Sequence, residues 1–391
     1  MNAVWLASWY PNRTSVSNGD FIERHAKAVA PFLTSLTVIA VVKDASLPLN
    51  ATEIFEEKNG NLTSYIVYYG RSRWGGILEK FLSVKKYIAL HLEIFDRIIK
   101  EKGKPDIVHV HVAMKAGIVA KKIKQLYNIP YIVTEHSSMY FKEAVPNIYS
   151  AGSFINSQAK AVLKNASLML TVSNELAKAI NMNFLRLNCR VVPNVVDASL
   201  FYPDNVLQEG PVRLIHVSGM GHPKNMDAII HALAVFKSKG GNFMMQVYGT
   251  APEAIILKVK AAALEENIFF HGEVLQPELA AAIRKADALI LYSNYETFGC
   301  VIIEANACGK PVIVSDIPVF HELVTEQKNG LFAKADDPNA LADVLKSFAE
   351  KKTLFNQTMI AAETVAKYSY PVVGRQIKAI YDEVLNNRIV N

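Results

Sequence analysis

The stretch DALILYSNYETFGCVIIEANACGKPVIVSD, residues 287–316, shows how this chain is organised. It opens with a β-favouring apolar run, continues through a polar loop at 294–299, and then has a helical pattern that starts at Cys300 and ends at Gly309. A second β-favouring run follows at 310–316. Strand, helix and strand in this order predict a βαβ unit, in which two parallel strands lie in one sheet.

The same alternation of short β-rich runs and helical patterns recurs in both halves of the chain. Between the halves, residues 191–205 contain Pro193 and Pro203 and favour no regular element, so we place the linker there. We predict an α/β protein with two doubly wound, Rossmann-like domains that face a central cleft, because ligands bind beyond the carboxyl ends of the strands in such sheets. The predicted domains are residues 1–197 and 198–371, followed by a C-terminal helix at 372–391. The predicted strands are residues 3–8, 37–42, 65–69, 106–111, 130–136 and 168–173 in the first half, and 213–218, 243–249, 267–272, 287–293 and 310–316 in the second.

The composition favours a two-domain protein outside the membrane. At 391 residues, of which 51% are hydrophobic, the chain is long enough for two packed cores. Its apolar runs are too short to span a bilayer, and its N-terminus has neither the basic region nor the sustained apolar region of a signal peptide. The three cysteines have no metal-ligand spacing, and we expect them to be core thiols. We therefore expect a cytoplasmic protein.

Positive charge is concentrated in the first half of the chain. Residues 1–197 carry 24 Lys and Arg against 15 Asp and Glu, and the remainder carries 18 against 21. This excess predicts contact with something anionic, such as nucleic acid, a phosphorylated substrate or a membrane surface. The most basic part, residues 71–104, has apolar residues at steps of three and four, which indicates a helix packed on the sheet. The simpler interpretation is that the outer face of this helix is solvated. A compatible addition is that this face meets anionic lipid through Arg71, Arg73, Trp74, Lys80, Lys85 and Lys86.

Two carboxylates flank the start of the helix at Cys300. Glu296 lies on the loop at the carboxyl edge of the predicted sheet, and Glu304 lies about one turn into the helix. Between them, the N–H groups of Phe298, Gly299 and Cys300 form a helix N-terminus, where the helix dipole favours an anion. Carboxylates bind hydroxyls by charge-assisted hydrogen bonds, so the set suits a ligand with hydroxyls at both ends and phosphate in the middle, such as a sugar nucleotide. Taken alone, two glutamates at this spacing are common and fit a capping or surface role better, and only the other loops favour the sugar nucleotide.

A second candidate loop follows the first predicted strand of the second half. It contains Gly219 and Gly221, but Lys224 occupies the third glycine position of a dinucleotide fingerprint, and no acidic residue ends the next strand. The pattern therefore disfavours a dehydrogenase. Lys224 at the head of a helix either meets a diphosphate as a point charge or is a solvated lysine. In the first half, Gly19 lies in the loop after the first strand, and His136 lies at the carboxyl edge of the fifth.

Together these segments resemble the retaining glycosyltransferases of family 4, which have the GT-B fold. The most specific segment is SNYETFGCVIIEANACGKPVIVSD (293–316), which looks like the family's E-x(7)-E motif in its full context. The similarity covers most of the chain: the glycine loop at Gly19, HVHVAMKAG (109–117), TEH (134–136), TVSNELAKAI (171–180), VPNVVDASLF (192–201), Lys224 with its helix, FHGEV (270–274) and NGLF (329–332).

The resemblance implies transfer of a hexosyl or hexosaminyl group from a UDP- or GDP-linked donor to an acceptor hydroxyl, with the anomeric configuration retained. It implies that the C-terminal domain binds the nucleotide, that the N-terminal domain binds a glycan or lipid-linked acceptor, and that the last helix returns to brace the N-terminal domain. The pathway would be lipopolysaccharide, capsule or other cell-surface glycan synthesis, with the enzyme peripheral at the inner membrane surface. The resemblance implies two catalytic residues: Glu296, which would contact the sugar hydroxyls, and His136, which would lie near the reacting carbon. It also implies that Glu304 binds the ribose, that Val274 contacts the base, and that Gly19 permits close approach of the donor. The diphosphate would be bound by Lys224, Phe298, Gly299 and Cys300.

The resemblance also bears on metal ions and on donor binding. The chain has no Asp-x-Asp pair, and a lysine with helix-terminal amides can stabilise a diphosphate, so we predict a reaction without metal or other cofactor. Where the family usually has an arginine five residues before the lysine, this sequence has Gly219. The diphosphate thus loses one expected cation, for which His222 and Arg284 are the candidate substitutes.

Two other functions fit part of the pattern. A sugar-nucleotide epimerase of the same fold would use the donor site but would need no acceptor site, which leaves the basic surface unexplained. A non-catalytic protein that binds nucleic acid or lipid would use the basic half and leave the donor-like residues without purpose. We therefore expect a nucleotide sugar and no nucleic acid as the partner.

Overall fold

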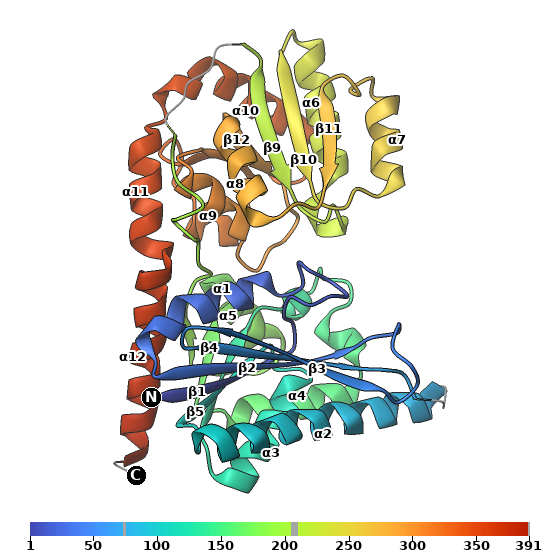
Figure 1. The fold of residues 1–391 in the computed structure, drawn as a ribbon. Helices are drawn as coiled ribbons and strands as arrows, with labels where there is room; N and C mark the ends of the chain where they lie inside the picture. The colour runs from blue at the N-terminus through green and yellow to red at the C-terminus, as the bar shows by residue number, and fades with distance from the viewer. Residues whose placement is uncertain (73–75, 205–209, 390–391) are drawn as a thin grey trace. The chain divides into compact units, whose positions relative to one another are not determined.

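The computed structural model describes the chain apart from residues 73–75, 205–209 and 390–391 (Figure 1). The chain forms two compact units: unit 1 comprises Met1–Asn194 and Tyr370–Asn391, and unit 2 comprises Val195–Ser369. The sequence-based boundaries at 197/198 and 371/372 lie a few residues beyond these limits. Each unit is an α/β structure with its own sheet, as the alternation of β-rich and helical segments predicts.

Unit 1 is built on an eight-stranded sheet. Its strands are β1 (Asn2–Ala7), β2 (Ser35–Lys43), β3 (Thr52–Asn59), β4 (Leu62–Tyr69), β5 (Ile107–His111), β6 (Tyr131–Glu135), β7 (Leu168–Thr171) and β8 (Cys189–Val191). Their order is β3-β4-β2-β1-β5-β6-β7-β8, and all pairs are parallel except the antiparallel hairpin of β3 and β4. Inner strands such as β5 and β6 are buried at every residue, because helices cover both faces of the sheet.

The helices of unit 1 form a layer on each face of this sheet (Figure 1). On one side, α3 packs against both α2 and α4; on the other, α1 packs against α12. Among the described helices of the whole chain, none is long and apolar enough to cross a bilayer. The helices of unit 1 are α1 (Asp20–Val29), η1 (Ala30–Phe32), α2 (Gly76–Lys102), α3 (Ala116–Tyr127), η2 (Ser138–Tyr140), η3 (Ile148–Ala151), α4 (Ser153–Asn165), α5 (Asn174–Asn183) and α12 (Tyr370–Ile389).

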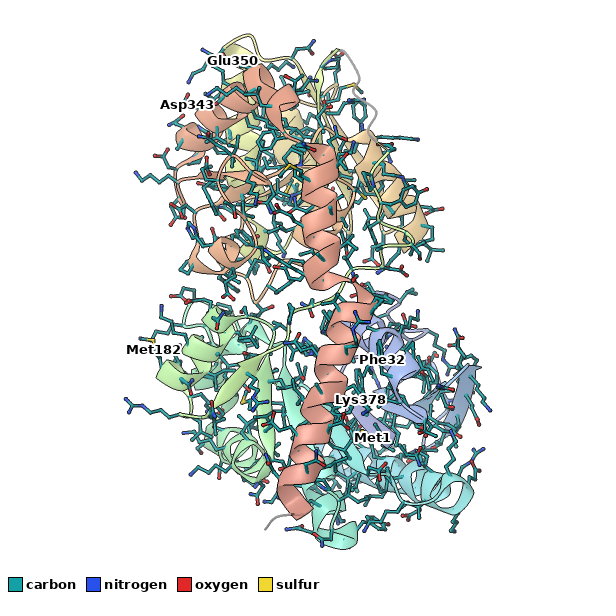
Figure 2. The ribbon with its side chains drawn as sticks, turned by 90° about the vertical axis from the view of Figure 1, so that its left-hand side faces the viewer. Met1, Phe32, Met182, Asp343, Glu350 and Lys378 are labelled. Carbon is teal, nitrogen blue, oxygen red and sulfur yellow. The ribbon has the colours of Figure 1, made fainter. Side chains whose placement is uncertain are left out.

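The C-terminal helix α12 is part of the core of unit 1. It crosses α1 at Gly374, where a Cβ would lie 2.0 Å from the backbone of α1 and 2.8 Å from the ring of Phe32 (Figure 2). Only glycine permits so close an approach. Further along α12, the Oη of Tyr381 accepts a hydrogen bond from the indole of Trp5 at 2.8 Å and lies 2.7 Å from Nδ1 of His109. These buried contacts connect the last helix to β1 and β5.

Unit 2 has a six-stranded, all-parallel sheet with the order β11-β10-β9-β12-β13-β14. Counted along the chain this is 3-2-1-4-5-6, the strand order of dinucleotide-binding domains. The strands are β9 (Val212–Val217), β10 (Phe243–Tyr248), β11 (Ile268–Gly272), β12 (Ala288–Leu291), β13 (Val312–Ser315) and β14 (Gly330–Ala333). The helices are η4 (His222–Lys224), α6 (Met226–Ser238), α7 (Glu253–Ala261), α8 (Gln276–Lys285), α9 (Cys300–Ala307), η5 (Pro318–Glu322), α10 (Pro338–Lys351), η6 (Lys352–Leu354) and α11 (Gln357–Tyr368).

In both sheets the order of the strands reverses at one place. In unit 1 this switch lies between β1 and β5, and in unit 2 it lies between β9 and β12. The loops that leave the carboxyl ends of the two strands diverge there and leave room for a ligand. The loops that carry Lys224 and Glu296 follow β9 and β12, so the fold of unit 2 places both at its switch.

Candidate functional site

Lys224 and Glu296 meet at the switch of unit 2. Lys224 is the last residue of η4, and its Nζ donates a hydrogen bond to Oε1 of Glu296. The hydroxyl of Ser293, two residues after β12, donates to the same carboxylate oxygen at 3.1 Å. The Lys224 side chain is 26% exposed and that of Glu296 is 12% exposed, so the pair is screened little by water and remains accessible. Two residues that the sequence singled out separately thus form one ion pair.

Two asparagines hold the loops of this ion pair together. The backbone N–H of Asn294 donates to the carbonyl of Pro223 at 2.7 Å, and the side-chain amide of Asn225 donates to that of Asn294 at 3.0 Å. Asn225 has a φ of 46°, in the left-handed region that asparagine tolerates best after glycine. Neither asparagine was predicted as a site residue, although their places in the chain, beside Lys224 and two residues before Glu296, are a usable signal.

A buried histidine fixes the glycine-rich turn before Lys224. Nδ1 of His216 donates to the carbonyl of Ile290 at 2.9 Å, which leaves Nε2 to accept a hydrogen bond from Ser218 at 2.7 Å. The Ser218 hydroxyl in turn accepts the N–H of Met220 at 3.0 Å. Burial lowers the pKa of His216 to about 4, so the ring is neutral near pH 7 and can act as this acceptor. A Cβ at Gly219, where the family usually has arginine, would meet no described atom within 4 Å.

The structure separates the two candidate substitutes for the missing arginine. The guanidinium of Arg284 donates to the carbonyl of Leu200 at 2.7 Å and lies 4.3 Å from the ring centroid of Tyr202. Arg284 is therefore engaged with the start of unit 2. His222 begins η4 and lies beside Lys224 in the chain, with its carbonyl accepting the side-chain amide of Asn294 at 3.4 Å. Of the two, His222 belongs to the loop of the Lys224–Glu296 pair.

Helix α9 begins at Cys300, four residues after Glu296. Its N-cap, Gly299, has φ 100° and ψ 63°, and a Cβ there would lie 3.1 Å from both Ile302 and Phe320. Phe298 is 3% exposed and packs its ring against that of Tyr368 at 6.0 Å, which anchors the loop. The positive end of the α9 dipole therefore lies at the loop that also carries the Lys224–Glu296 pair.

Glu304 and Val274 lie at different places around this centre. Glu304, on α9, is 3% exposed. Burial raises the pKa of the Cys308 thiol to about 12, and the negative charge of the nearby Glu304 also raises it. Val274 is partly buried on the loop after β11, two strands away from β9, or about 10 Å at the usual strand spacing.

Of the three cysteines expected to be core thiols, only Cys308 is buried; Cys189 and Cys300 are partly exposed because they begin β8 and α9.

In unit 1, His136 lies directly after β6 in a group of buried histidines. It is 6% exposed, its Nε2 lies 3.2 Å from Nδ1 of His111, and the Phe21 ring lies 4.8 Å away. Burial lowers its pKa well below the usual value, so the ring is neutral near pH 7. Its Nδ1 has no hydrogen-bond partner among the described residues. A buried polar atom without a partner is rare and calls for an explanation, which a bound ligand would supply.

The residue before His136 organises its loop. Glu135 is fully buried and accepts the backbone N–H groups of Ala113, His136 and Ser137 and the hydroxyl of Tyr140, at 2.9–3.1 Å. Burial raises the pKa of Glu135, and the four donors oppose this by stabilising the carboxylate. This carboxylate therefore links the loop after β5 to the loop after β6. Glu135 was not predicted as a site residue, although it lies beside His136 in the TEH segment (134–136).

Gly19 is required by the fold of unit 1 itself. It is the N-cap of α1 with φ 72°, and a Cβ there would lie 2.5 Å from the carbonyl carbon of Trp9. We expect Gly19→Ala to lower the free energy of unfolding by more than the ~1–2 kcal/mol of a left-handed residue alone, because the methyl group also meets backbone. Urea denaturation measures this, with Gly60→Ala as the control: Gly60 has φ 57° and open space around it. Equal destabilisation by the two changes would contradict the packing role.

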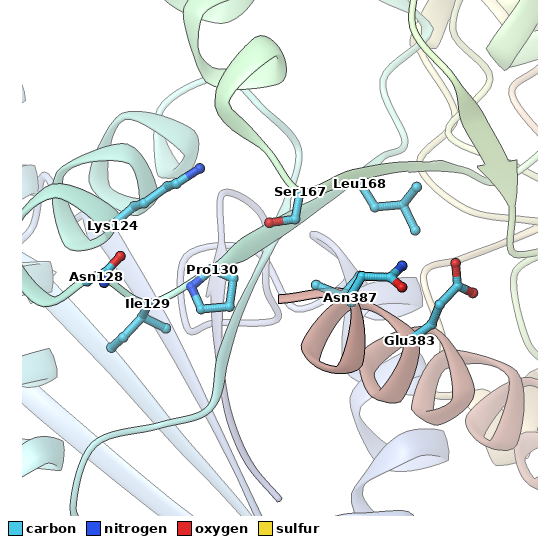
Figure 3. Close-up of a pocket in the computed structure, with 9 residues that line it drawn as sticks. Lys124, Asn128, Ile129, Pro130, Ser167, Leu168, Glu383 and Asn387 are labelled. Carbon is cyan, nitrogen blue, oxygen red and sulfur yellow. The ribbon is translucent and has the colours of Figure 1, made fainter. Parts of the chain in front are cut away.

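A further hollow lies at the opposite edge of the unit 1 sheet. Its volume is about 330 Å³, and its walls include Pro130 before β6, Ser167 before β7 and Glu383 on α12 (Figure 3). These positions are at the amino ends of the strands, whereas ligands of open parallel sheets bind beyond the carboxyl ends.

Among the described residues, no three His, Cys, Asp or Glu side chains gather at metal-ligating distances. Each unit therefore has its own set of candidate residues, at the carboxyl edge of its own sheet.

Comparison with known proteins gives the family. Two family models match consecutive segments: Glycosyltransferase Family 4 over residues 23–200, and Glycosyl transferases group 1 over residues 201–365. An uncharacterized glycosyltransferase of Methanocaldococcus jannaschii is 26% identical over 317 residues, which cover 78% of this chain and 83% of the relative.

Solved structures agree in fold. Sucrose-phosphate synthase from Thermosynechococcus elongatus superposes with a TM-score of 0.80 at 19% identity, over 99% of this chain and 100% of that one. HepE from Anabaena, in complex with UDP and glucose, gives a TM-score of 0.69 at 17% identity, over 97% of this chain and 99% of that one. The chain therefore belongs to the family 4 glycosyltransferases and has the two-domain GT-B fold.

Proposed function

We propose that the protein is a retaining glycosyltransferase that moves a hexosyl or hexosaminyl group from a nucleotide-diphosphate sugar to an acceptor hydroxyl. The observation that carries the proposal is the contact between Lys224 and Glu296 at the switch of unit 2, beside the N-terminus of α9. A cation and a helix N-terminus suit a diphosphate, and a carboxylate suits the hydroxyls of a sugar. The relatives give no support to the alternative of a sugar-nucleotide epimerase.

Different residues bind different parts of the donor. Lys224 and the backbone N–H groups from Phe298 to Cys300 bind the diphosphate, and Glu296 binds the sugar hydroxyls. The loop at Val274 receives the base, because a nucleotide extended from β9 toward β11 reaches it over about 10 Å. The donor is linked to UDP or GDP, and the complex of HepE with UDP and glucose favours UDP. Glu304 contacts the ribose, Gly19 keeps its loop open to the donor, and His136 contacts the sugar near the reacting carbon.

The chemistry is stabilisation of the leaving group. As the bond between the anomeric carbon and the phosphate oxygen breaks, negative charge grows on the diphosphate, and fixed donors at that place lower the barrier. Lys224 and the α9 N-terminus supply the opposing positive charge, so we propose that no metal ion is needed. For retention, the acceptor oxygen attacks from the face that the phosphate leaves, and its proton passes to the released diphosphate.

Nucleotide binding tests the proposal directly. We expect UDP or GDP, but not both equally, to raise the melting temperature of the full chain in the presence of EDTA. At a ligand concentration of about 100 Kd the stabilisation is about 2.7 kcal/mol, which corresponds to several degrees for a domain of this size. The measurement is a thermal-shift screen with UDP, GDP, ADP and their sugar conjugates. A shift that appears only after Mg²⁺ is added would overturn metal independence, and no shift with any nucleotide would overturn the donor site.

The positive charge of the first half of the chain bears on the identity of the acceptor. The first half of the chain carries the excess of Lys and Arg, which suits a phosphorylated or membrane-bound acceptor. We propose a lipid-linked or glycan acceptor of cell-surface glycan synthesis, with the enzyme peripheral at the inner membrane surface. Flotation with anionic vesicles at low salt checks the membrane contact, and recovery of all the protein in the unbound fraction would remove it.

A further inference from the structure

Unit 1 contains a cavity that the donor site does not use. Its volume is about 660 Å³, within the range of ligand pockets, and it lies between the carboxyl edge of the sheet and helices α2, α3 and α4. Its floor includes Ser8 after β1 and the loop after β5. The side chains that matter for its chemistry are mostly aliphatic: Val84 and Ile88 on α2, Ile118 on α3, and Ile155, Ala159 and Val162 on α4.

Apolar side chains also stand exposed where α2 and α4 border the cavity. Val84 on α2 is 52% exposed, and Ile155 on α4 is 45% exposed, although both line the cavity wall. Beside them, Phe81 and Phe154 are 55% and 75% exposed. Water-exposed apolar groups that continue into an apolar cavity mark a surface that binds an apolar ligand.

The charged side chains of the cavity wall are three lysines and one glutamate. Lys80 and Lys115 are exposed at its wall, and Lys43 lines it while bonded to Glu79. The phenol of Tyr87 is buried in the wall, and its Oη, although near Ser8, makes no hydrogen bond of good geometry with a described residue. This hydroxyl and that of Ser8 are the polar groups that the wall offers to a ligand at this place.

The cavity shares its wall with the loop of His136. Ser137, the next residue, lines the cavity, and so does Ala113, whose N–H is bound by the carboxylate of Glu135. Val112, in the same wall, has a φ of 69°, which is unusual for a β-branched residue. Strained backbone of this kind gathers at functional sites. A molecule in the cavity would therefore have its polar end near the residue that we assign to the reacting sugar.

We propose that the cavity binds the hydrocarbon chain of a lipid-linked acceptor, and that Lys80 and Lys115 bind the phosphate that joins chain and glycan. This inference rests on the proposed function and specifies its acceptor. A glycan alone would need a wall rich in hydrogen-bonding groups, which the aliphatic side chains of α2 and α4 do not offer. Of the basic residues that the sequence analysis assigned to a lipid surface, Lys80 lines the cavity, and Nζ of Lys86 is bonded to the carbonyls of Asn50 and Ala51. Arg73 and Trp74 lie outside the described residues.

Farnesyl phosphate is the probe for this site, because it combines a branched aliphatic chain with a phosphate. We expect the full chain to bind it, by calorimetry below its micellar concentration, at least tenfold more tightly than farnesol or inorganic phosphate. Ile155→Glu should weaken binding at least tenfold by placing a charge against the chain, and Ala159→Phe should do so by filling the cavity. The matched control is Ile256→Glu on α7, since Ile256 is 46% exposed and Ile155 is 45% exposed.

Each outcome bears on the proposal. Circular dichroism identifies a variant that fails to fold, and the other variant then supplies the result. Unchanged farnesyl phosphate affinity in a folded cavity variant would overturn the proposal, as would inorganic phosphate binding as tightly as farnesyl phosphate. Loss of anionic vesicle binding with unchanged farnesyl phosphate affinity would instead indicate a docking face for bilayer lipid. The nucleotide thermal shift, measured on the same variants, should be unchanged. Its absence in the wild type would count against the donor site and leave the cavity result intact.

Discussion

The variant Lys224→Met is expected to lower the rate of sugar transfer about 10²–10³-fold, the usual effect of removing one preorganised donor from a developing negative charge. The Nζ of Lys224 is held by Glu296 and its backbone by the turn of η4, so the cation is already in place before the donor binds. Methionine keeps an unbranched apolar stem of similar length and removes the ammonium group, with its charge and its hydrogen-bond donors. The melting temperature without ligand should fall modestly, because the largely buried Glu296 carboxylate loses its cation and keeps the hydroxyl of Ser293 as a donor.

Steady-state rates with the donor that the thermal-shift screen selects measure this effect. The control is Lys258→Met, because Lys258 forms an exposed ion pair with Asp227 in the same unit, on α7 and α6. That variant should transfer sugar at the wild-type rate. If Lys224→Met retained more than about a tenth of wild-type activity, the leaving-group role of this residue would be wrong.

The variant Glu296→Gln is expected to separate binding from turnover. The carboxylate neutralises Lys224 in the protein without ligand, so its removal frees a cation and should tighten the binding of the free nucleoside diphosphate several-fold. The same change weakens the charge-assisted hydrogen bonds to the donor sugar, each worth about 1.5–3 kcal/mol, so kcat should fall ten- to a hundredfold or more. A single substitution would thus improve the binding of the product and impair the reaction.

Calorimetry with the nucleoside diphosphate and steady-state kinetics with the donor measure the two effects on one preparation. Asp227→Asn is the matched control, since it also removes the carboxylate of a lysine pair from unit 2. A parallel loss of nucleotide affinity and of kcat would show that Glu296 mainly positions Lys224. Unchanged kcat would contradict contact with the donor sugar.

Most of the parallel strands were predictable because each is a short β-rich run, but the short strands β8 and β14 and the antiparallel strand β3 were not. The sequence of β3 contains Glu53, Glu56, Glu57 and Lys58, and all of its residues are exposed. It is an edge strand that pairs only with β4, and charge on such a strand prevents pairing with other molecules. The available signal was Gly60 in the turn after it, with φ 57°, which a tight hairpin requires. A pattern of apolar residues identifies a strand only where the strand is buried. An exposed edge strand lacks this pattern and is therefore missed.

The site was predictable as a set of loops, but not as a set of contacts. Strand order places the loops of Lys224 and Glu296 at one switch, and the doubly wound pattern implies this. Their ion pair depends on side-chain directions that one-dimensional spacing does not contain. The partners of His216 and Glu135 were missed for the same reason: each binds backbone groups of another strand or loop. The assignments of His136, Glu304 and Val274 to parts of the donor remain predictions.

The contact of Tyr381 with Trp5 and His109 has a consequence for the order in which the chain folds during synthesis. Unit 1 contains the first strand and the last helix, with all of unit 2 between them in the chain. A ribosome adding about 5–20 residues per second needs roughly ten to thirty seconds to make unit 2 after the sheet of unit 1 is complete. During this time α1 lacks the helix that covers it, and the groove that receives Gly374 stands open. The N-terminal unit is thus the first to begin folding and the last to finish, and nascent chains stalled before residue 370 should bind chaperones through this uncovered face.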